Sequence, residues 1–137
     1  MKKVFYALSL FLLLITITGC SLFGKYKEYA GDYEATVVKV GSMDYTYQYE
    51  YYTISLDKKG GCYVTSKSKY QNSVYEAYGT YKIEDGKIYI ITSNGSQSVT
   101  EEYDYTEDGV IIMSTSLNGI TLYAEFERQI ETESETK

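Results

Sequence analysis

Residues 74–93 of the 137-residue chain read VYEAYGTYKIEDGKIYIITS. Two runs of strand-forming residues flank the dipeptide Asp85-Gly86, and both of its residues tolerate the positive φ that a type I′ turn requires. In the first run, apolar and small residues occupy the odd positions from 75 to 83 and alternate with mostly polar ones. The odd positions are therefore expected to face a core. This segment predicts an antiparallel β-hairpin with one buried face.

Similar turn signals recur along the chain. Gly-Gly, Asn-Gly and Asp-Gly dipeptides separate alternating runs at Gly60-Gly61, Asn94-Gly95, Asp108-Gly109 and Asn118-Gly119. Close and fairly even spacing of this kind is typical of an antiparallel all-β domain. We expect eight strands, near residues 31–41, 47–57, 61–68, 74–84, 87–93, 97–106, 109–116 and 119–128.

An eight-stranded antiparallel meander of this size closes most readily into a barrel, because closure removes the exposed edges that invite aggregation. The interior of such a barrel is either filled by side chains or holds one small ligand. A two-sheet sandwich is the alternative. Charged residues on the outward faces of several strands argue against a barrel that spans a membrane.

Side-chain alternation assigns the faces of some strands and is ambiguous in others. In the last strand, Ile120, Leu122, Ala124 and Phe126 alternate with mostly polar residues and are expected to face the core. Residues 87–91 and 110–113 are apolar on both faces. We therefore expect part of this apolar surface to lie outside the barrel, under a covering segment or at a contact surface: Tyr89, Ile91, Ile111 and Met113.

Composition and charge exclude several functions. The chain contains 18 Tyr, 4 Phe, no His and no Pro, and its formal net charge is −6. Phosphate binding requires a cationic surface, so we expect no nucleic-acid partner. Without His, the chain lacks the usual proton shuttle at neutral pH and the commonest metal ligand.

The first twenty residues have the features of an export signal. Met1-Lys2-Lys3 is positively charged, and the uncharged run from Val4 to Thr18 is shorter than the about 20 apolar residues of a spanning helix. The run ends in Ile17-Thr18-Gly19-Cys20, which resembles the lipobox of bacterial lipoproteins. The resemblance implies that Cys20 carries a diacylglycerol and anchors the protein to the cell membrane, facing outside the cytoplasm. In the alternative, an ordinary secreted protein, Cys20 is incidental or pairs with Cys62.

These features divide the chain into four parts. Residues 1–19 are the expected signal peptide, 20–30 a lipid-attached tether, 31–128 the barrel domain and 129–137 an acidic disordered tail. Lipidation of Cys20 leaves Cys62 as a lone thiol. We expect that thiol to be a small buried residue and not a nucleophile.

Within residues 31–128, several segments resemble the lipocalin-like domains of small bacterial lipoproteins. They are Gly31-Asp32-Tyr33, Gly79-Thr80-Tyr81-Lys82-Ile83 with Asp85-Gly86, Lys87-Ile88-Tyr89-Ile90, and the closing strand to Phe126. Lipocalins open with Gly-x-Trp and close with an Arg that packs over that ring. The resemblance implies that Arg128, which is the only Arg of the chain, packs on Tyr33 and closes the barrel base.

A cluster of inward aromatic and small residues is the candidate ligand site. Ligand pockets are typically apolar and aromatic with a few polar groups, which Tyr hydroxyls can supply. The candidates are Tyr33, Tyr75, Ala77, Gly79, Tyr81, Tyr103, Tyr105 and Phe126. The same residues also describe an ordinary filled core, so a cavity and a packed interior both remain open. The leading hypothesis is a lipid-anchored, non-catalytic cell-envelope protein that binds a small apolar or amphipathic molecule inside the barrel.

Tyrosines at period two suggest a competing surface site. Because Tyr52, Ile54 and Leu56 are expected in the core, the residues that alternate with this face should point outward: Tyr45, Tyr47, Tyr49 and Tyr51. Exposed rings suit stacking on a glycan or an envelope protein, and the patch of Ile91, Ile111 and Met113 is the other candidate for such a contact. Ordinary packing between neighbouring strands explains the same tyrosines more simply.

No motif for catalysis or metal binding stands out. Asp104 to Gly109 superficially resembles the start of a calcium loop, but Thr115 occupies the position of the required Glu. No carboxylate pair at a defined separation, nucleophile elbow or phosphate loop is present in the sequence. We expect no enzymatic activity, no metal and no cofactor. Hydrolysis by two carboxylates ranks third, after ligand binding in the barrel and a surface interaction.

Overall fold

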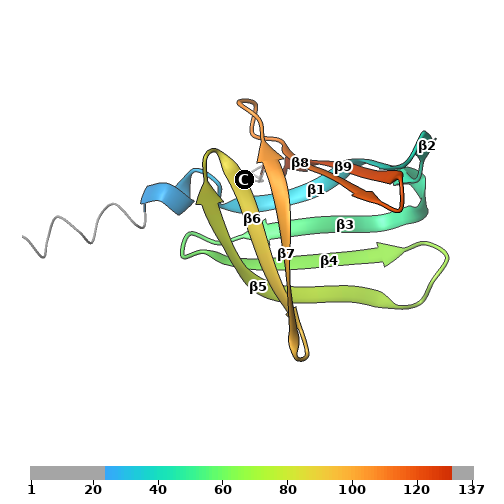
Figure 1. Cartoon of the computed structure of the whole chain (residues 1–137), viewed down its shortest axis with the longest axis horizontal. Helices are drawn as coiled ribbons and strands as arrows, with labels where there is room; N and C mark the ends of the chain where they lie inside the picture. The colour runs from blue at the N-terminus through green and yellow to red at the C-terminus, as the bar shows by residue number, and fades with distance from the viewer. Residues whose placement is uncertain (1–23, 131–137) are drawn as a thin grey trace, which may run out of the picture.

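A nine-stranded antiparallel sheet closes on itself in the computed structural model, which describes residues 24–130 (Figure 1). Eight long strands form a meander, and pairing of the first with the last closes the barrel; the short strand β2 extends one side of β1. This confirms the predicted eight-stranded antiparallel barrel. The strands are β1 (Gly31–Val40), β2 (Met43–Asp44), β3 (Tyr49–Leu56), β4 (Gly61–Ser68), β5 (Val74–Glu84), β6 (Lys87–Asn94), β7 (Gln97–Tyr105), β8 (Ile111–Leu117) and β9 (Ile120–Arg128).

The strand boundaries follow the predicted turn signals. β4 and β5 have the predicted limits, and the other long strands differ from the prediction by a residue or two at their ends. Asp85 and Asn118 have the positive φ expected for hairpin dipeptides, at 51° and 52°. The local chemistry of the turns therefore accounts for most of the strand order.

One half of the barrel has a filled interior. Its largest fully buried side chains come from every long strand except β4: Tyr33, Ile54, Tyr81, Ile88, Ile90, Tyr103, Ile111 and Phe126. The rings of Tyr52 and Phe126 meet edge to face, with their centroids 4.9 Å apart. Cys62 is buried in the same core, as predicted, and burial raises the pKa of its thiol to about 11.

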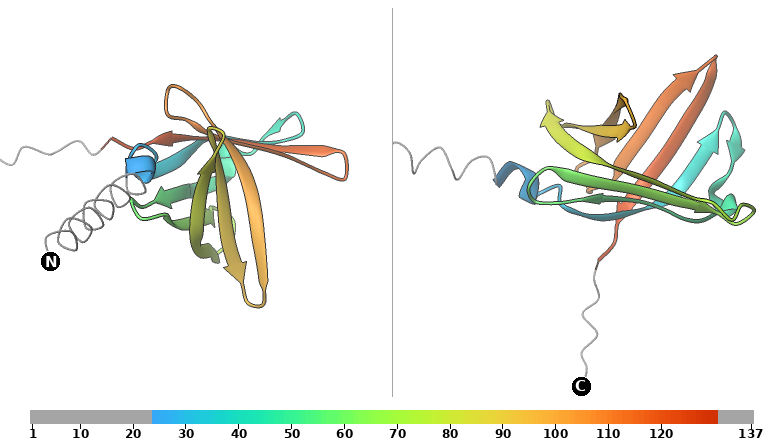
Figure 2. Two further views of the ribbon diagram at one scale, coloured as in Figure 1. Left: turned by 60° about the vertical axis from the view of Figure 1, so that its left-hand side comes forward. Right: turned by 90° about the horizontal axis from the view of Figure 1, so that it is seen from below.

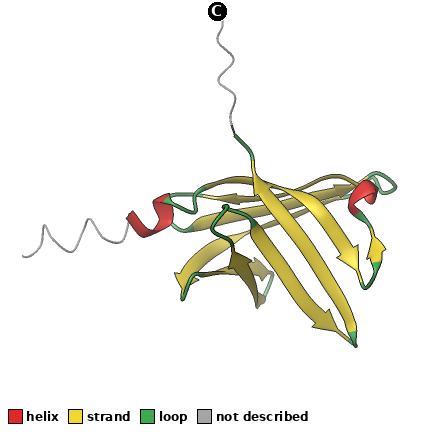
Figure 3. Cartoon of the chain, turned by 90° about the horizontal axis from the view of Figure 1, so that it is seen from above, coloured by secondary structure: helices red, strands yellow, loops and turns green. Residues whose placement is uncertain are grey.

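Residues 24–30, which precede β1, cover one end of the barrel. We call these residues the covering segment and this end of the barrel the closed end. Residues 24–27 are helical (Figure 3). Tyr26 packs edge to face on Tyr81, and Tyr29 packs on Tyr105. Backbone carbonyls of this segment also accept hydrogen bonds from buried hydroxyls, including Tyr29 O from Tyr33 Oη at 2.7 Å. The prediction of a tether over residues 20–30 is therefore wrong for its final part, which belongs to the domain.

Arg128, the last residue of β9, also covers the closed end. Its guanidinium carbon lies 5.3 Å from the centre of the Tyr33 ring, and its Nη2 donates a hydrogen bond to Tyr33 Oη at 2.6 Å. Nη2 also donates to the backbone carbonyl of Glu28 and to Tyr105 Oη. The predicted contact between Arg128 and Tyr33 is confirmed, and it ties β1 and β9 to the covering segment.

The other half of the barrel is open because β7 and β8 separate. These strands pair only where Tyr103–Tyr105 faces Ile111–Met113. Beyond that point the β6–β7 hairpin and the β8–β9 hairpin diverge, as Figure 2 shows. The 3₁₀ turn η1 (Thr46–Gln48) lies toward this open half, and the helical residues 24–27 lie at the other end (Figure 3). The barrel therefore has one covered end and one open half.

The predicted outward positions of Ile111 and Met113 are wrong. Ile111 is fully buried and pairs in register with Tyr105 and Phe126, while Met113 pairs with Tyr103 and packs on the core. Because residues 106–110 form a longer loop than the expected two-residue turn, β8 begins at Ile111 with that side chain inward. The prediction holds for Tyr89 and Ile91, which alternate with the buried Ile88 and Ile90 and are half-buried on the outer face.

Replacing Gly79 with alanine should destabilise the barrel. A Cβ at this position would lie 1.9 Å from the backbone carbonyl oxygen of Ile91, so β5 and β6 would have to move apart. Overpacking of this kind costs about 1–3 kcal/mol. Urea unfolding should show a loss in that range for Gly79→Ala and almost none for Thr80→Ala, whose side chain is exposed. Equal stability of Gly79→Ala and the wild type would contradict the close approach of these strands.

Candidate ligand site in the open half of the barrel

Most of the predicted ligand residues belong to the filled core. Tyr33, Tyr81 and Phe126 are almost completely buried, and Tyr81 Oη donates a hydrogen bond to the backbone carbonyl of Asp57 at 2.7 Å. Burial raises the pKa of Tyr33 to about 12, against the opposing effect of Arg128. Ala77 is also buried, and Gly79 serves the close approach of two strands and leaves no room for a ligand. These residues hold the closed half together.

Tyr105 and Tyr103 lie in different environments, although both were predicted as ligand residues. Tyr105 belongs to the closed end, where it contacts Tyr29 and Arg128. Tyr103 is buried, and its hydroxyl donates a hydrogen bond to a carboxylate oxygen of Glu101 at 2.8 Å. Burial, and then the charge of Glu101, raise the pKa of Tyr103. The Tyr103 hydroxyl therefore connects the core to the open half.

Large apolar side chains on the inward face are exposed where β7 and β8 diverge. The strand register places them on the face that is buried elsewhere in the barrel, because Thr92 faces Val99, Ser66 faces Tyr75 and Leu117 faces Ile120. Tyr75 and Val99 lie on β5 and β7, and Leu117 and Ile120 face each other on the β8–β9 hairpin. We call this set of exposed inward residues the mouth: Tyr75 (56% exposed), Val99 (48%), Leu117 (63%) and Ile120 (52%). The predicted inward direction of Ile120 and Tyr75 is correct, but neither is in the core.

Two hollows lie beside β7, and Tyr75 and Val99 of the mouth line the first of them. One, of about 370 Å³, lies between β5, β6 and β7 and is lined by Val74, Tyr75, Glu76, Ala77, Thr92, Ser93, Val99 and Glu101. The other, of about 330 Å³, lies between β7 and β8 and is lined by Thr100, Glu101, Glu102, Asp104, Ile112, Met113, Ser114 and Thr115. Both volumes are at the lower end of the range for small-molecule sites. Glu101 contributes to both hollows.

The sequence analysis missed three groups at this site. Val99 and Glu101 are inward residues of a strand whose alternation carried no strong apolar signal, and Tyr49 was expected on the outer face. Tyr49 packs on Tyr52 with ring centroids 5.5 Å apart. Burial, and then the charge of Glu101, raise the pKa of Tyr52, whose ring also touches Phe126. An aromatic wall and one carboxylate therefore meet at the inner edge of the mouth.

The four tyrosines predicted to point outward do not form one surface. Residues 46–48 form a 3₁₀ turn, and the β3–β4 register shifts between Tyr49 and Tyr51. Tyr45 and Tyr49 therefore pack on the core, Tyr47 is exposed and Tyr51 is half-buried on the outer face. The prediction of an outward row is wrong, and so is the alternative patch, because Ile111 is buried and Met113 packs on the core.

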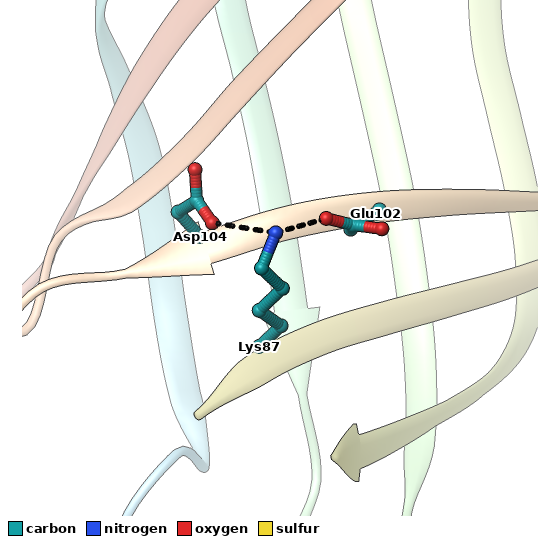
Figure 4. A network of polar contacts seen from close by, with 3 residues as sticks. All are labelled: Lys87, Glu102 and Asp104. Carbon is teal, nitrogen blue, oxygen red and sulfur yellow. Dashed lines mark hydrogen bonds and ion pairs between the residues drawn. The ribbon is translucent and has the colours of Figure 1, made fainter. Parts of the chain in front are cut away.

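Three charged residues on the outer face of β6 and β7 form a short ion-pair network. Lys87 Nζ contacts the carboxylates of Glu102 and Asp104, with 3.3 Å to Asp104 Oδ1 (Figure 4). These contacts raise the pKa of Lys87, but the groups are exposed and add little stability. Across residues 24–130, no Lys or Arg forms an ion pair with Glu101. Glu101 is therefore a carboxylate available at the mouth.

The described part of the chain shows neither a metal cluster nor a spanning helix. Among residues 24–130, no three His, Cys, Asp or Glu side chains lie together as metal ligands would. No helix in the same range has the length and apolar character needed to cross a membrane. The predicted signal peptide and the lipid-attachment residue Cys20 lie outside the described residues.

Fold and site together define the class of this domain as a lipocalin-like antiparallel barrel that is open on one side. No protein-family model matches the chain, and no curated protein matches its sequence. The functional argument therefore depends on the geometry of the open half.

Proposed function

We propose that this is a lipid-anchored, non-catalytic protein of the cell envelope whose open barrel half binds a small apolar or amphipathic molecule. The mouth carries this proposal. Four large apolar side chains on the inward face lie in contact with solvent, although the same face is buried throughout the closed half. Exposed apolar surface of this kind is typical of binding sites, because covering it stabilises the complex.

The polar groups of the site favour an amphipathic ligand over a purely apolar one. Glu101 lies between the two hollows and accepts a hydrogen bond from Tyr103. A carboxylate next to an aromatic wall suits a neutral donor or a cationic group on the ligand, while Val99 and Tyr75 contact its apolar part.

The anchor is proposed from the sequence, and the fold is compatible with it. The described chain begins with the helical residues 24–27 at the closed end, away from the mouth (Figure 3). Attachment through a lipid at Cys20 would therefore place the closed end nearer the bilayer. The mouth would face away from the membrane and receive its ligand from that side.

A titration with the neutral fluorescent probe N-phenyl-1-naphthylamine tests this function. Its emission rises when it leaves water, so the wild-type protein should increase the fluorescence in a saturable way. The double variant Tyr75→Ser with Val99→Ser should bind at least about tenfold more weakly, because it removes apolar surface at the mouth. Both side chains are about half exposed, so the fold should survive the change.

The matched control replaces two exposed tyrosines elsewhere. Tyr47→Ser with Tyr78→Ser also removes exposed aromatic surface, but neither residue lines a hollow of the mouth. This control should retain wild-type affinity. Equal affinity of both double variants, or no saturable binding by the wild type, would contradict a ligand site in the open half.

A further inference from the structure

The separation of β7 from β8 leaves two strand edges unpaired. β7 continues from its paired part through Gln97–Glu102, and β8 continues through Ser114–Leu117, while their partners on the other side, β6 and β9, stay in register throughout. We call the space between these two segments the β7–β8 gap. Figure 2 shows the two hairpins that bound it pointing in different directions.

Each of these edges can accept another strand. Along an unpaired edge, alternate residues direct their backbone N–H and C=O groups outward, where an extended chain can bond to them. Natural barrels normally remove or protect such edges. Here the edges adjoin a hollow of about 330 Å³ and exposed apolar residues of the mouth. An added strand would cover both.

The charge of the gap indicates the chemistry of that strand. Glu101 and Glu102 are the carboxylates of its β7 edge, and Lys87 contacts Glu102 and the neighbouring Asp104, which lies in the paired part of β7. A basic segment would complement this charge. The chain's own C-terminal residues 131–137 read ETESETK and are acidic, and the β7 edge of a second copy would bring the same carboxylates together.

We propose that the β7–β8 gap binds an extended peptide segment with alternating apolar and basic residues, as an added β-strand. Its apolar side chains would lie on the inward side with Val99 and Leu117. Its basic side chains would lie on the outward side, where Glu102 belongs to the outer face of β7. This proposal concerns a protein partner and does not rest on small-molecule binding.

Titration of ¹⁵N-labelled protein with the peptide acetyl-(Lys-Val)₃-amide tests the proposal by NMR. The largest shifts are expected in Gln97–Glu102 and Ser114–Leu117, together with slower amide exchange in both segments. The same peptide methylated on alternate backbone nitrogens should bind far more weakly, because it cannot complete the strand ladder. An acetyl-(Glu-Val)₃-amide peptide should not bind.

Two charge variants separate the gap from the overall acidity of the chain. Glu101→Gln with Glu102→Gln should weaken binding of the lysine peptide by roughly tenfold. Glu34→Gln with Glu127→Gln removes the same charge from paired positions on β1 and β9 and should not change it. Equal effects of the two variants, equal binding of the methylated peptide, shifts mapping elsewhere or no binding at all would each overturn the proposal.

Discussion

Replacing Phe126 with alanine is expected to lower the free energy of unfolding by about 3–5 kcal/mol, which is a large part of the about 5–15 kcal/mol typical of a domain. The ring is fully buried, pairs in register with Ile111 and Ala35, and meets Tyr52 edge to face. Its removal would leave a cavity at the seam where the last strand closes the barrel. Chemical unfolding followed by circular dichroism measures the loss.

Ile120 provides the matched control, because it lies on the same strand and the same inward face as Phe126. It is about half exposed at the mouth, so Ile120→Ala should cost only a small fraction of the loss caused by Phe126→Ala. Similar losses for the two variants would mean that the filled core extends into the open half. The division between a packed half and an open half would then be wrong.

Replacing Cys20 with alanine is expected to move the protein from the membrane fraction to the soluble fraction. If Cys20 carries a diacylglycerol, its chains contribute about 0.8 kcal/mol for each buried CH₂, and nothing else in the described residues could replace them by spanning the membrane as a helix. Fractionation of cells that express the full chain, followed by immunoblotting, measures the distribution.

Cys62 is the control for this experiment, because it is the only other cysteine in the sequence. Its side chain is buried on β4, and its Sγ donates to the carbonyl oxygen of Thr80 at 3.6 Å. Cys62→Ala should therefore remain in the membrane fraction. Continued membrane association of the Cys20→Ala protein would exclude the proposed lipid anchor.

Local sequence chemistry accounts for the hairpins but not for every face. The dipeptides Asp85-Gly86 and Asn118-Gly119 place two turns correctly because both residues accept positive φ, and the strands next to them follow. β8 is apolar at successive positions, so its alternation does not distinguish the two faces. Its direction depends on the length of the preceding loop, which hydrogen bonds between Thr106 and Val110 determine.

The strand predicted over residues 47–57, which the structure replaces with η1 and β3, shows how a local irregularity can make a periodic pattern misleading. The tyrosines from Tyr45 to Tyr51 have period two in sequence, but Asp44 Oδ1 accepts a hydrogen bond from Thr46 N, and a 3₁₀ turn follows. A register shift after Tyr49 then exchanges the faces. Side-chain hydrogen bonds and bulges of this kind depend on the fold and are not visible in hydrophobic alternation.

The mouth could not be predicted because it results from long-range geometry. β7 and β8 pair only between Tyr103–Tyr105 and Ile111–Met113, whereas β1 and β9 pair along most of their length and close the barrel. Nothing in the composition of Gln97–Glu102 indicates an unpaired edge. The sequence analysis therefore placed the candidate ligand site in the interior, while the structure has its exposed apolar surface at the open half.

This geometry assigns different proposed roles to the two halves of the barrel. The closed half, with Arg128, Tyr33 and the covering segment, gives stability and holds the strands that carry the mouth. The open half exposes apolar side chains beside Glu101 and two hollows. A change in the closed half should therefore act mainly on stability, and a change at the mouth mainly on binding.

Native mass spectrometry of the full protein, purified from its own membranes in mild detergent, tests ligand binding at the mouth most directly. The wild-type protein and the Tyr47→Ser with Tyr78→Ser control should each carry the same small molecule, detected as a discrete mass above that of the protein. The Tyr75→Ser with Val99→Ser protein should lose it while retaining its fold and its anchor. A wild-type protein that carries no such molecule, or a mouth variant that retains it, would contradict the account.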